Sequence, residues 1–316
     1  MSSNTKENNH NKKCPKCYYI RQADDYAPEW QCPNCGIAYT KFKAATTPGP
    51  GNLLSGGSDI QWFRTLRIFF LLVLLFFVGM SSWLTRLRTT DWDNPLWVVV
   101  YPINGDNSLT SSNYIESLRG YEFEAVEHFI RQEAKHYALT LKEPVTIKLA
   151  PRVDKVPPRP PDGGSMLSVI WWSLKTRYWA YTVDTYNGPA AEIQIFVVYY
   201  DPETNKLLKH SLGLEKGLIG IVNAFADKRM TAQNNLVIAH ELLHTVGATD
   251  KYDSATDQPV YPHGYAEPDK RPLLPQSKAE IMAGSIPLSK GRSEMPLSLK
   301  DTVIGITTAK EIRWIN

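Results

Sequence analysis

The sequence predicts an α+β fold in its larger C-terminal part, preceded by a small cysteine-bearing module and one apolar helix. Three observations support this. Strand-like and helix-like patterns alternate irregularly after residue 91, four cysteines stand in two close pairs near the N-terminus, and an uncharged run separates the two regions. The net charge is only +3. A nucleic-acid-binding protein usually carries a concentrated basic excess, so nucleic acid is not an expected partner.

The N-terminal cysteines predict a zinc ribbon over residues 12–42. They follow the pattern C-x2-C, fourteen residues, C-x2-C, in the turns CPKC and CPNCG. Each turn directs two thiolates at one ion, and four thiolates suit a tetrahedral, structural Zn²⁺. Two disulfides in a secreted module are the other interpretation, but they rarely take this double-turn form. The predicted ligands are Cys14, Cys17, Cys32 and Cys35.

The segments on either side of this ribbon are low in apolar residues. Residues 1–11 are polar and rich in Asn and Lys, which predicts a disordered tail. Residues 43–60 are rich in Pro, Gly, Ser and Thr, which predicts a flexible linker.

The uncharged run Ile68 to Leu84 predicts a single transmembrane helix over residues 66–85. A helix of that length spans about 25 Å, at the short end of a bilayer crossing. A buried core helix would show a polar stripe, and a cleaved signal peptide would not follow 67 residues of chain. Because thiolate zinc sites suit a reducing compartment, we expect a cytoplasmic N-terminus. Residues 91–316 are then expected on the periplasmic or extracellular side of the cell (inner) membrane.

Apolar patterning divides residues 91–316 into strands and helices. The predicted strands are residues 96–103, 145–149, 193–200 and 218–222. The predicted helices are residues 112–139 with Gly120 as a point of interruption, 165–179, 231–246 ended by Gly247, and 299–312 with Ser298 as N-cap. The four prolines of residues 152–164 predict a loop.

The helix predicted over residues 165–179 carries a stripe at helical spacing: Leu167, Ile170, Trp171, Leu174 and Tyr178. The same segment holds an aromatic cluster: Trp171, Trp172, Tyr178, Trp179 and Tyr181. The favoured interpretation is an aromatic-rich core helix. A membrane-surface or peptide-binding face is the alternative.

The segment VIAHELLHTVGATDKYD, residues 237–253, carries the pattern H-E-x-x-H. Histidines four apart lie about 40° apart around a helix axis, so His240 and His244 can bind one Zn²⁺. Glu241 stands beside the first histidine, within reach of a water on the same ion. Gly247 favours a sharp turn after the helix, which can return Asp250 as a third ligand.

In these residues the chain resembles the metzincin zinc peptidases, whose motif is H-E-x-x-H-x-x-G-x-x-H. It has Asp250 where most members have histidine, as in the snapalysin-like group. Met282, in AEIMAGSIP, is similar to the methionine of the family's Met-turn; Gly284 stands where some members have a tyrosine. The resemblance implies a mixed sheet with an active-site helix and a Met-turn. It also implies a substrate lying along an edge strand, by position near residues 207–214.

Other third ligands are conceivable. Glu267 and Glu280 are the candidates for the gluzincin arrangement, but both stand among prolines and glycines. His263 and Asp253 are also candidates, although Asp253 better suits a role in stabilising the loop. Asp250 is favoured because Gly247 directs the chain toward it.

The sequence therefore predicts a membrane-anchored zinc metalloendopeptidase acting on a peptide or protein substrate. Zn²⁺ is held by His240, His244 and Asp250, and Glu241 is the general base. A non-catalytic membrane sensor, whose cytoplasmic ribbon binds a protein partner, is the alternative. A metal-dependent hydrolase that does not cut peptides also remains open.

Overall fold

A computed structural model of the chain describes residues 12–41, 58–161, 163, 165–208, 211–214 and 218–315. In the first long helix, the side chains of residues 58–61, 77–78 and 81–90 are outside that description. The chain forms two compact units, Met1–Leu71 and Leu72–Asn316. The predicted tail, residues 1–11, and most of the predicted linker, residues 43–60, lie outside the described residues.

The first unit consists of two cysteine turns that repeat one backbone pattern. In each turn the first cysteine donates its N–H to a residue five positions later, Cys14 to Tyr19 and Cys32 to Ile37. It also accepts from the residue four positions later, Tyr18 or Gly36, and both of these have a left-handed backbone. A short 3₁₀ helix, η2 (Tyr39–Lys41), follows the second turn. The arrangement agrees with the two turns predicted for CPKC and CPNCG.

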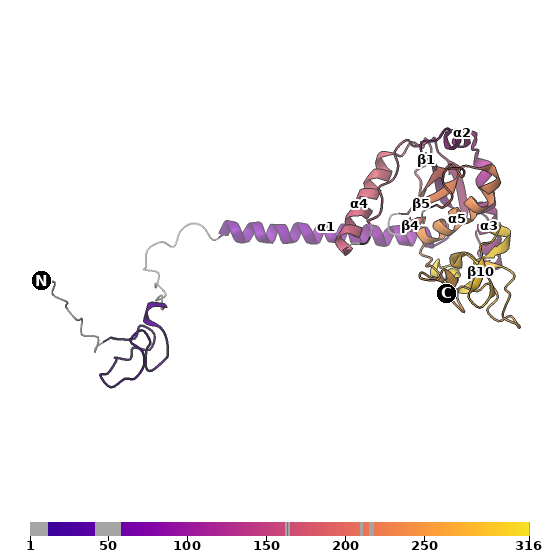
Figure 1. The fold of residues 1–316 in the computed structure, drawn as a ribbon. Coiled ribbons are helices and arrows are strands. Elements are labelled where there is room, and N and C mark those ends of the chain that lie inside the picture. The colour runs from indigo at the N-terminus through magenta and orange to yellow at the C-terminus, as the bar shows by residue number, and fades with distance from the viewer. Residues whose placement is uncertain are drawn as a thin grey trace. The chain divides into compact units, whose positions relative to one another are not determined.

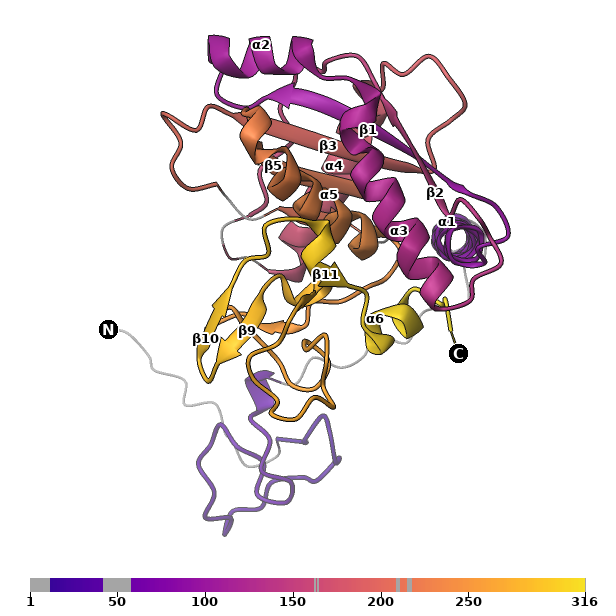
Figure 2. The same ribbon diagram turned by 90° about the vertical axis from the view of Figure 1, so that its right-hand side faces the viewer.

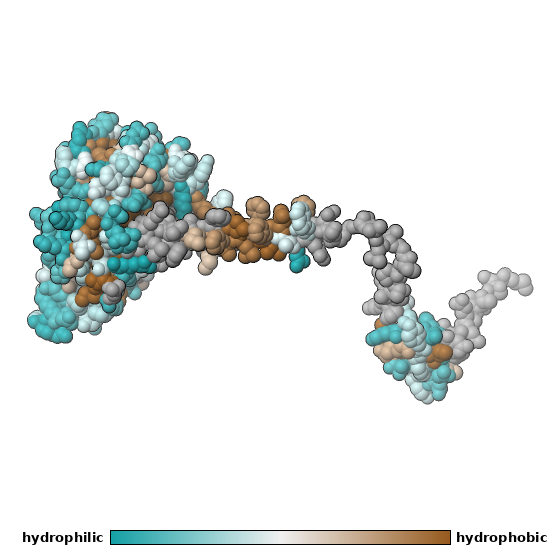
Figure 3. Space-filling view, turned by 180° about the vertical axis from the view of Figure 1, so that it is seen from behind, coloured by the Kyte–Doolittle hydropathy of each residue, from teal (hydrophilic) through white to brown (hydrophobic). Residues whose placement is uncertain are grey.

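Helix α1 (Ser58–Thr90) covers the whole of the predicted span, residues 66–85 (Figure 1). It also includes Ser58 to Ile60, so the predicted linker ends earlier than expected. Its described apolar residues from Ile68 to Phe76 are mostly exposed, and Figure 3 shows them as an apolar surface along the helix. Among the described residues, no helix meets the combined length and hydropathy required for crossing a membrane.

The second unit is built on a five-stranded mixed sheet with the strand order β2-β1-β3-β5-β4. Its strands are β1 (Leu96–Asn104), β2 (Val145–Leu149), β3 (Ile193–Tyr200), β4 (Leu212–Leu214) and β5 (Ile219–Phe225). All neighbours pair in parallel except β4, which runs antiparallel to β5. The four predicted strands are confirmed to within three residues. Because β4 is outermost, an edge strand lies within the predicted residues 207–214.

Helices cover both faces of this sheet (Figure 2). One core contains Val98 and Val100 of β1 together with residues of α2 (Leu109–Ser117), α3 (Glu124–His136) and α5 (Thr231–Thr245). A second core contains Val99 and Tyr101 of β1 and residues of α4 (Met166–Thr182). The alternation follows from the two-residue period of a strand. The predicted α+β class with a mixed sheet is confirmed.

The single helix predicted over residues 112–139 is two helices. Helix α2 ends at Ser117, and a 3₁₀ turn, η3 (Gly120–Phe123), precedes α3. Leu118 and Arg119 adopt extended backbone there, next to the Gly120 named as a point of interruption. The break lets Ile115 and Phe123 both reach the same core.

The remaining elements of the second unit, one just before α5 and the others after it, are short and irregular. They are η5 (Lys228–Met230) just before α5 and, after it, β6 (Tyr252–Asp253), β7 (Gln258–Pro259), β8 (Ala279–Glu280), η6 (Ile281–Ala283), β9 (Ile286–Ser289), β10 (Arg292–Glu294), η7 (Leu299–Asp301), β11 (Thr302–Val303) and α6 (Ile306–Glu311). The single helix predicted over residues 299–312 is therefore wrong. Ser298 caps only η7, and Thr302 and Val303 pair in parallel with β8.

The outer face of α4 also differs from the prediction. The helix itself is confirmed, with Ser165 as N-cap, but the predicted stripe faces away from the core. Trp171 and Tyr178 are 71% and 72% exposed, whereas Trp172 and Trp179 are each 9% exposed. The helix is apolar on both faces, so its periodicity alone could not show which face packs on the sheet.

Candidate metal centre

Helix α5 places His240 and His244 side by side with their Nε2 atoms 3.0 Å apart. Each ring is held by its other nitrogen: His240 Nδ1 lies 2.9 Å from the Ile281 carbonyl and His244 Nδ1 lies 2.8 Å from the Ala248 carbonyl. Carbonyl oxygens only accept, so each Nδ1 carries the hydrogen and each Nε2 presents a lone pair. Two lone pairs aimed at one point are the arrangement that a metal ion requires.

Asp250 completes this group, as predicted. The chain turns at Gly247, whose φ of 106° is open to glycine and strained for other residues. Asp250 Oδ1 then lies 3.3 Å from His240 Nε2 and 3.1 Å from His244 Nε2. A tetrahedral ion with bonds of about 2.0 Å separates its ligand atoms by about 3.3 Å. The three residues fit a metal ion of that size, and they form one of two such groups among the described residues.

The ionisation of the group is set by its own contacts. Burial alone would raise the pKa of Asp250, but its interactions with the side chains of His240 and His244 hold that pKa well below its ordinary value. Burial alone would lower the pKa of His244, but the Asp250 carboxylate and the Ala248 carbonyl outweigh it and raise that pKa. Asp250 is therefore an anion throughout the physiological range, as a metal ligand must be.

Glu241 lies next to this group, 4% exposed, on the buried side of α5. Its Oε2 atom is buried and makes no hydrogen bond within the described part of the chain. Burial raises the pKa of Glu241, against the opposing influence of His240 and His244. A buried carboxylate oxygen without a partner is costly, so a functional explanation is needed for it.

The edge strand β4 passes directly over this part of α5. A Cβ atom at Gly213 would lie 2.4 Å from His244 Cβ, 2.9 Å from the Glu241 backbone oxygen and 3.2 Å from Glu241 Oε2. Only glycine allows this approach. The outermost strand of the sheet therefore borders the metal-binding group and the free carboxylate together.

Met282 lies fully buried in η6, the turn that also supplies the Ile281 carbonyl to His240. Gly284 closes this turn with a left-handed backbone. The carboxylate of Glu280 stabilises the turn: it accepts from Ala283 N at 3.0 Å, Gly305 N at 3.1 Å and the Thr308 hydroxyl at 2.6 Å. The turn thus orients one metal-binding ring.

A clamp that the sequence did not predict holds the loop of Asp250 on both sides. Lys251 donates from Nζ to Glu311 at 2.7 Å and from its backbone N–H to the Met282 carbonyl at 2.9 Å. The N–H and hydroxyl of Thr249 also donate to Glu311, at 2.9 and 2.7 Å. We call Thr249, Lys251 and Glu311 the loop clamp. The sequence gives no sign that Lys251 forms an ion pair, because its partner Glu311 is far along the chain.

Tyr252 is a second residue that the sequence did not single out. Burial and the negative charge of the neighbouring Asp250 raise its pKa, with a smaller contribution from Glu241. A protonated phenol therefore stands close to the metal-binding group. The metzincin resemblance points only to the position two residues after Met282, which Gly284 occupies.

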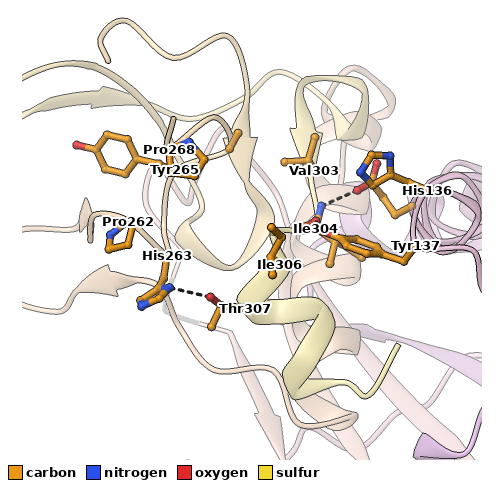
Figure 4. A pocket seen from close by; sticks show the side chains of 13 residues that line it. His136, Tyr137, Pro262, His263, Tyr265, Pro268, Val303, Ile304, Ile306 and Thr307 are labelled. Carbon is orange, nitrogen blue, oxygen red and sulfur yellow. Dashed lines mark hydrogen bonds between the residues drawn. The ribbon is translucent and has the colours of Figure 1, made fainter. Parts of the chain in front are cut away.

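The rival ligands are engaged elsewhere. Glu280 stabilises the Met282 turn, Glu267 accepts from the backbone of Ser277, and Asp253 caps the turn at Thr256. His263 lies in a separate cavity of about 530 Å³, lined also by Glu133, His136 and Tyr137, where its Nδ1 is 2.7 Å from the Thr307 hydroxyl (Figure 4). The expected assignment of Asp253 to the loop holds.

The four cysteines form the second group that can hold a metal ion. Their sulfur atoms lie within 4.8 Å of one another, with Cys14 Sγ 3.7 Å from Cys35 Sγ and Cys17 Sγ 3.6 Å from Cys32 Sγ. A disulfide would bring sulfurs to about 2 Å, whereas a tetrahedral ion with bonds of about 2.3 Å separates them by about 3.8 Å. All four cysteines are free. The cluster can form the predicted zinc ribbon.

Comparison with models of known protein families and with characterised proteins finds no match for this chain.

Proposed function

We propose that His240, His244 and Asp250 hold a catalytic Zn²⁺ and that the chain is a zinc-dependent endopeptidase of metzincin type. The observation that carries this proposal is the buried Glu241 Oε2, which lacks a partner beside a group that offers three ligands only. Structural zinc sites have four protein ligands, whereas catalytic sites have three and leave a position for water or substrate. A sensor would have no use for an unpaired buried carboxylate at that position.

The bound ion, Glu241 and Tyr252 would each have a separate role in peptide hydrolysis. When bound, Zn²⁺ acidifies a coordinated water and polarises the substrate carbonyl. Glu241 accepts the proton of that water and delivers it to the amine that leaves. Its raised pKa suits both steps, because a carboxylate of higher pKa is a better base and a proton donor nearer to neutrality. Tyr252 is available as a hydrogen-bond donor to the carbonyl oxygen as it gains charge.

The substrate would lie along β4. This strand is outermost in the sheet and borders His244 and Glu241 through Gly213. An extended peptide can add to such an edge by main-chain hydrogen bonds. The Met282 turn and the order of the elements around the sheet support the metzincin assignment.

For the rest of the chain we propose a structural Zn²⁺ in the cysteine cluster and attachment of α1 to the cell membrane as a single span. The uncharged run of α1 and the exposure of Ile68 to Phe76 support attachment. The N-terminal unit would be cytoplasmic and residues 91–316 would lie outside. Protease added to intact spheroplasts should then remove the C-terminal domain and spare the cysteine unit. The reverse pattern would contradict this orientation.

The variant Glu241→Gln tests the catalytic assignment. Glutamine has nearly the same shape and is not a ligand, so both metal ions should stay bound while hydrolysis of a quenched-fluorescent peptide pool falls about 10²–10⁴-fold. Glu267→Gln, a carboxylate held away from the site by Ser277, is the matched control and should keep full activity. Unchanged hydrolysis by Glu241→Gln would refute the proposed role. Absence of hydrolysis in every version, with a cytoplasmic protein still bound to the ribbon, would favour the sensor.

A further inference from the structure

The outward face of α4 is a continuous apolar stripe without a partner among the described residues. At 3.6 residues per turn, six side chains fall within an arc of about 100°. Their exposed fractions run from 49% to 82%. We call them the outer stripe: Leu167, Ile170, Trp171, Leu174, Tyr178 and Tyr181.

The opposite face of the same helix packs on the sheet. Trp172, Thr176, Trp179 and Ala180 are buried, and Trp179 and Ala180 belong to the second core. Burial therefore accounts for only three of the eleven apolar residues of the helix. A contiguous exposed apolar surface of six large side chains marks an interaction site.

The charged residues within α4 are both cations. From Ser165 to Val183 the chain has no acidic residue, and Lys175 and Arg177 fall on either side of the stripe in the helical projection. Trp172 Nε1 donates to the Pro158 carbonyl at 2.9 Å, which ties the preceding loop to α4 one residue from the exposed Arg159. Apolar residues with Trp and Tyr, flanked by cations, match the headgroup region of an anionic membrane.

The chain leaves little room between this domain and a membrane. The uncharged run of α1 ends at Leu84, and α1 itself continues as a helix to Thr90, six residues farther. Six helical residues span about 9 Å. If α1 is inserted as proposed above, the domain begins within the headgroup layer or just beyond it.

We propose that the outer stripe of α4 lies in the headgroup region of an anionic phospholipid bilayer, as a second membrane contact beside α1. This inference rests on the proposed membrane attachment of α1. A second copy of the chain could also cover an apolar stripe, but it would give no reason for cations on both flanks and no acid between them.

Tryptophan quenching by lipid tests the inference in the full chain, reconstituted into vesicles of phosphatidylcholine and phosphatidylglycerol with brominated acyl chains. Trp171→Phe should lose one tryptophan's share of the quenched fluorescence. Trp172→Phe is the matched control, because Trp172 is the next residue and is buried; the quenched signal should not fall. Leu174→Glu, which places an acid in the stripe, should abolish the quenching of Trp171 while both metal ions stay bound.

The outcomes separate the two proposals. A chain that does not float with the vesicles would overturn the attachment of α1 and this inference with it. A chain that floats, with equal quenching in wild type and Trp171→Phe, would leave the attachment of α1 intact and refute the contact of α4. In that case, sedimentation that shows an oligomer lost in Leu174→Glu would assign the stripe to a second copy.

Discussion

The two metal-binding groups of this chain are built in opposite ways. The cysteine cluster has four ligands from two turns that repeat each other within one short segment. The group of His240, His244 and Asp250 offers three candidate ligands, two from a helix and one from a loop. The first group is complete by itself. The second is complete only with a fourth partner.

The difference extends to what surrounds each group. The cysteine turns are held by backbone hydrogen bonds between residues four or five positions apart. The second group depends on distant elements: the Met282 turn orients His240, Gly213 of β4 lies against His244, and Glu311 holds the loop of Asp250. A site made locally suits a structural ion, whereas a site made by the whole fold can be shaped for a reaction.

Metal content gives the largest expected effect. The full chain should bind two Zn²⁺ ions. His240→Ala should lose one because two ligands remain, and Cys14→Ser should weaken only the other. Elemental analysis after exhaustive dialysis measures both, with His263→Ala, engaged with Thr307, as the control that keeps two ions. Loss of both ions in either variant would show that the groups are not independent.

The second largest expected effect is the loss of stability when the loop clamp is broken. Lys251→Met leaves Glu311 without its cation and should destabilise the C-terminal domain by about 3 kcal/mol, the low end for a broken buried pair because Glu311 is partly exposed. Lys251→Met combined with Glu311→Gln should cost less than Lys251→Met alone. Denaturant unfolding measures both. Unfolding free energies that simply add would show that the pair is not coupled.

Gly213→Ala should have a smaller effect at the same site. The added Cβ must move β4 away from His244, which should cost about 2 kcal/mol of stability and raise KM for peptides that pair with the edge. Gly120→Ala is the control, since no atom lies within 4 Å of its added Cβ. If Gly213→Ala leaves KM unchanged, β4 does not bind the substrate.

The smallest expected effect lies in the cysteine unit. Tyr18 and Gly36 occupy equivalent positions with φ of 60° and 67°. Tyr18→Gly should relieve the left-handed strain and stabilise the metal-bound unit by about 0.5 kcal/mol, after the entropy cost of glycine. Gly36→Ala should act in the opposite direction. Competition with a metal-binding dye measures both, and equal shifts would contradict the strain argument.

Local patterns in the sequence predicted the parts of each site that are local. The spacing of His240 and His244 and the turn at Gly247 were sufficient to predict that three candidate ligands come together. The two C-x2-C turns were sufficient to predict the cysteine cluster. The strands followed from apolar runs. The loop clamp could not be predicted, because its two halves are 62 residues apart. The predicted ends of α2 and α6 were also wrong. Packing determines where α2 ends, and the pairing of β11 with β8 determines where α6 begins, so apolar periodicity does not show either. In α4 the favoured prediction of a core helix was wrong for the stripe, because both faces are apolar and periodicity does not show which one packs on the sheet.

The hydrogen bonds from Thr249 to Glu311 affect the order in which contacts can form while the chain is synthesised. A chain emerges N-terminus first, at about 5–20 residues per second, so the 62 residues between these partners take about 3–12 s. During that interval the helix with both histidines is already present, but the loop that carries Asp250 lacks its hydrogen bonds to Glu311. The cysteine cluster, whose contacts are all local, can form long before. The group of His240, His244 and Asp250 is thus the later of the two metal-binding groups to acquire all of its supporting contacts.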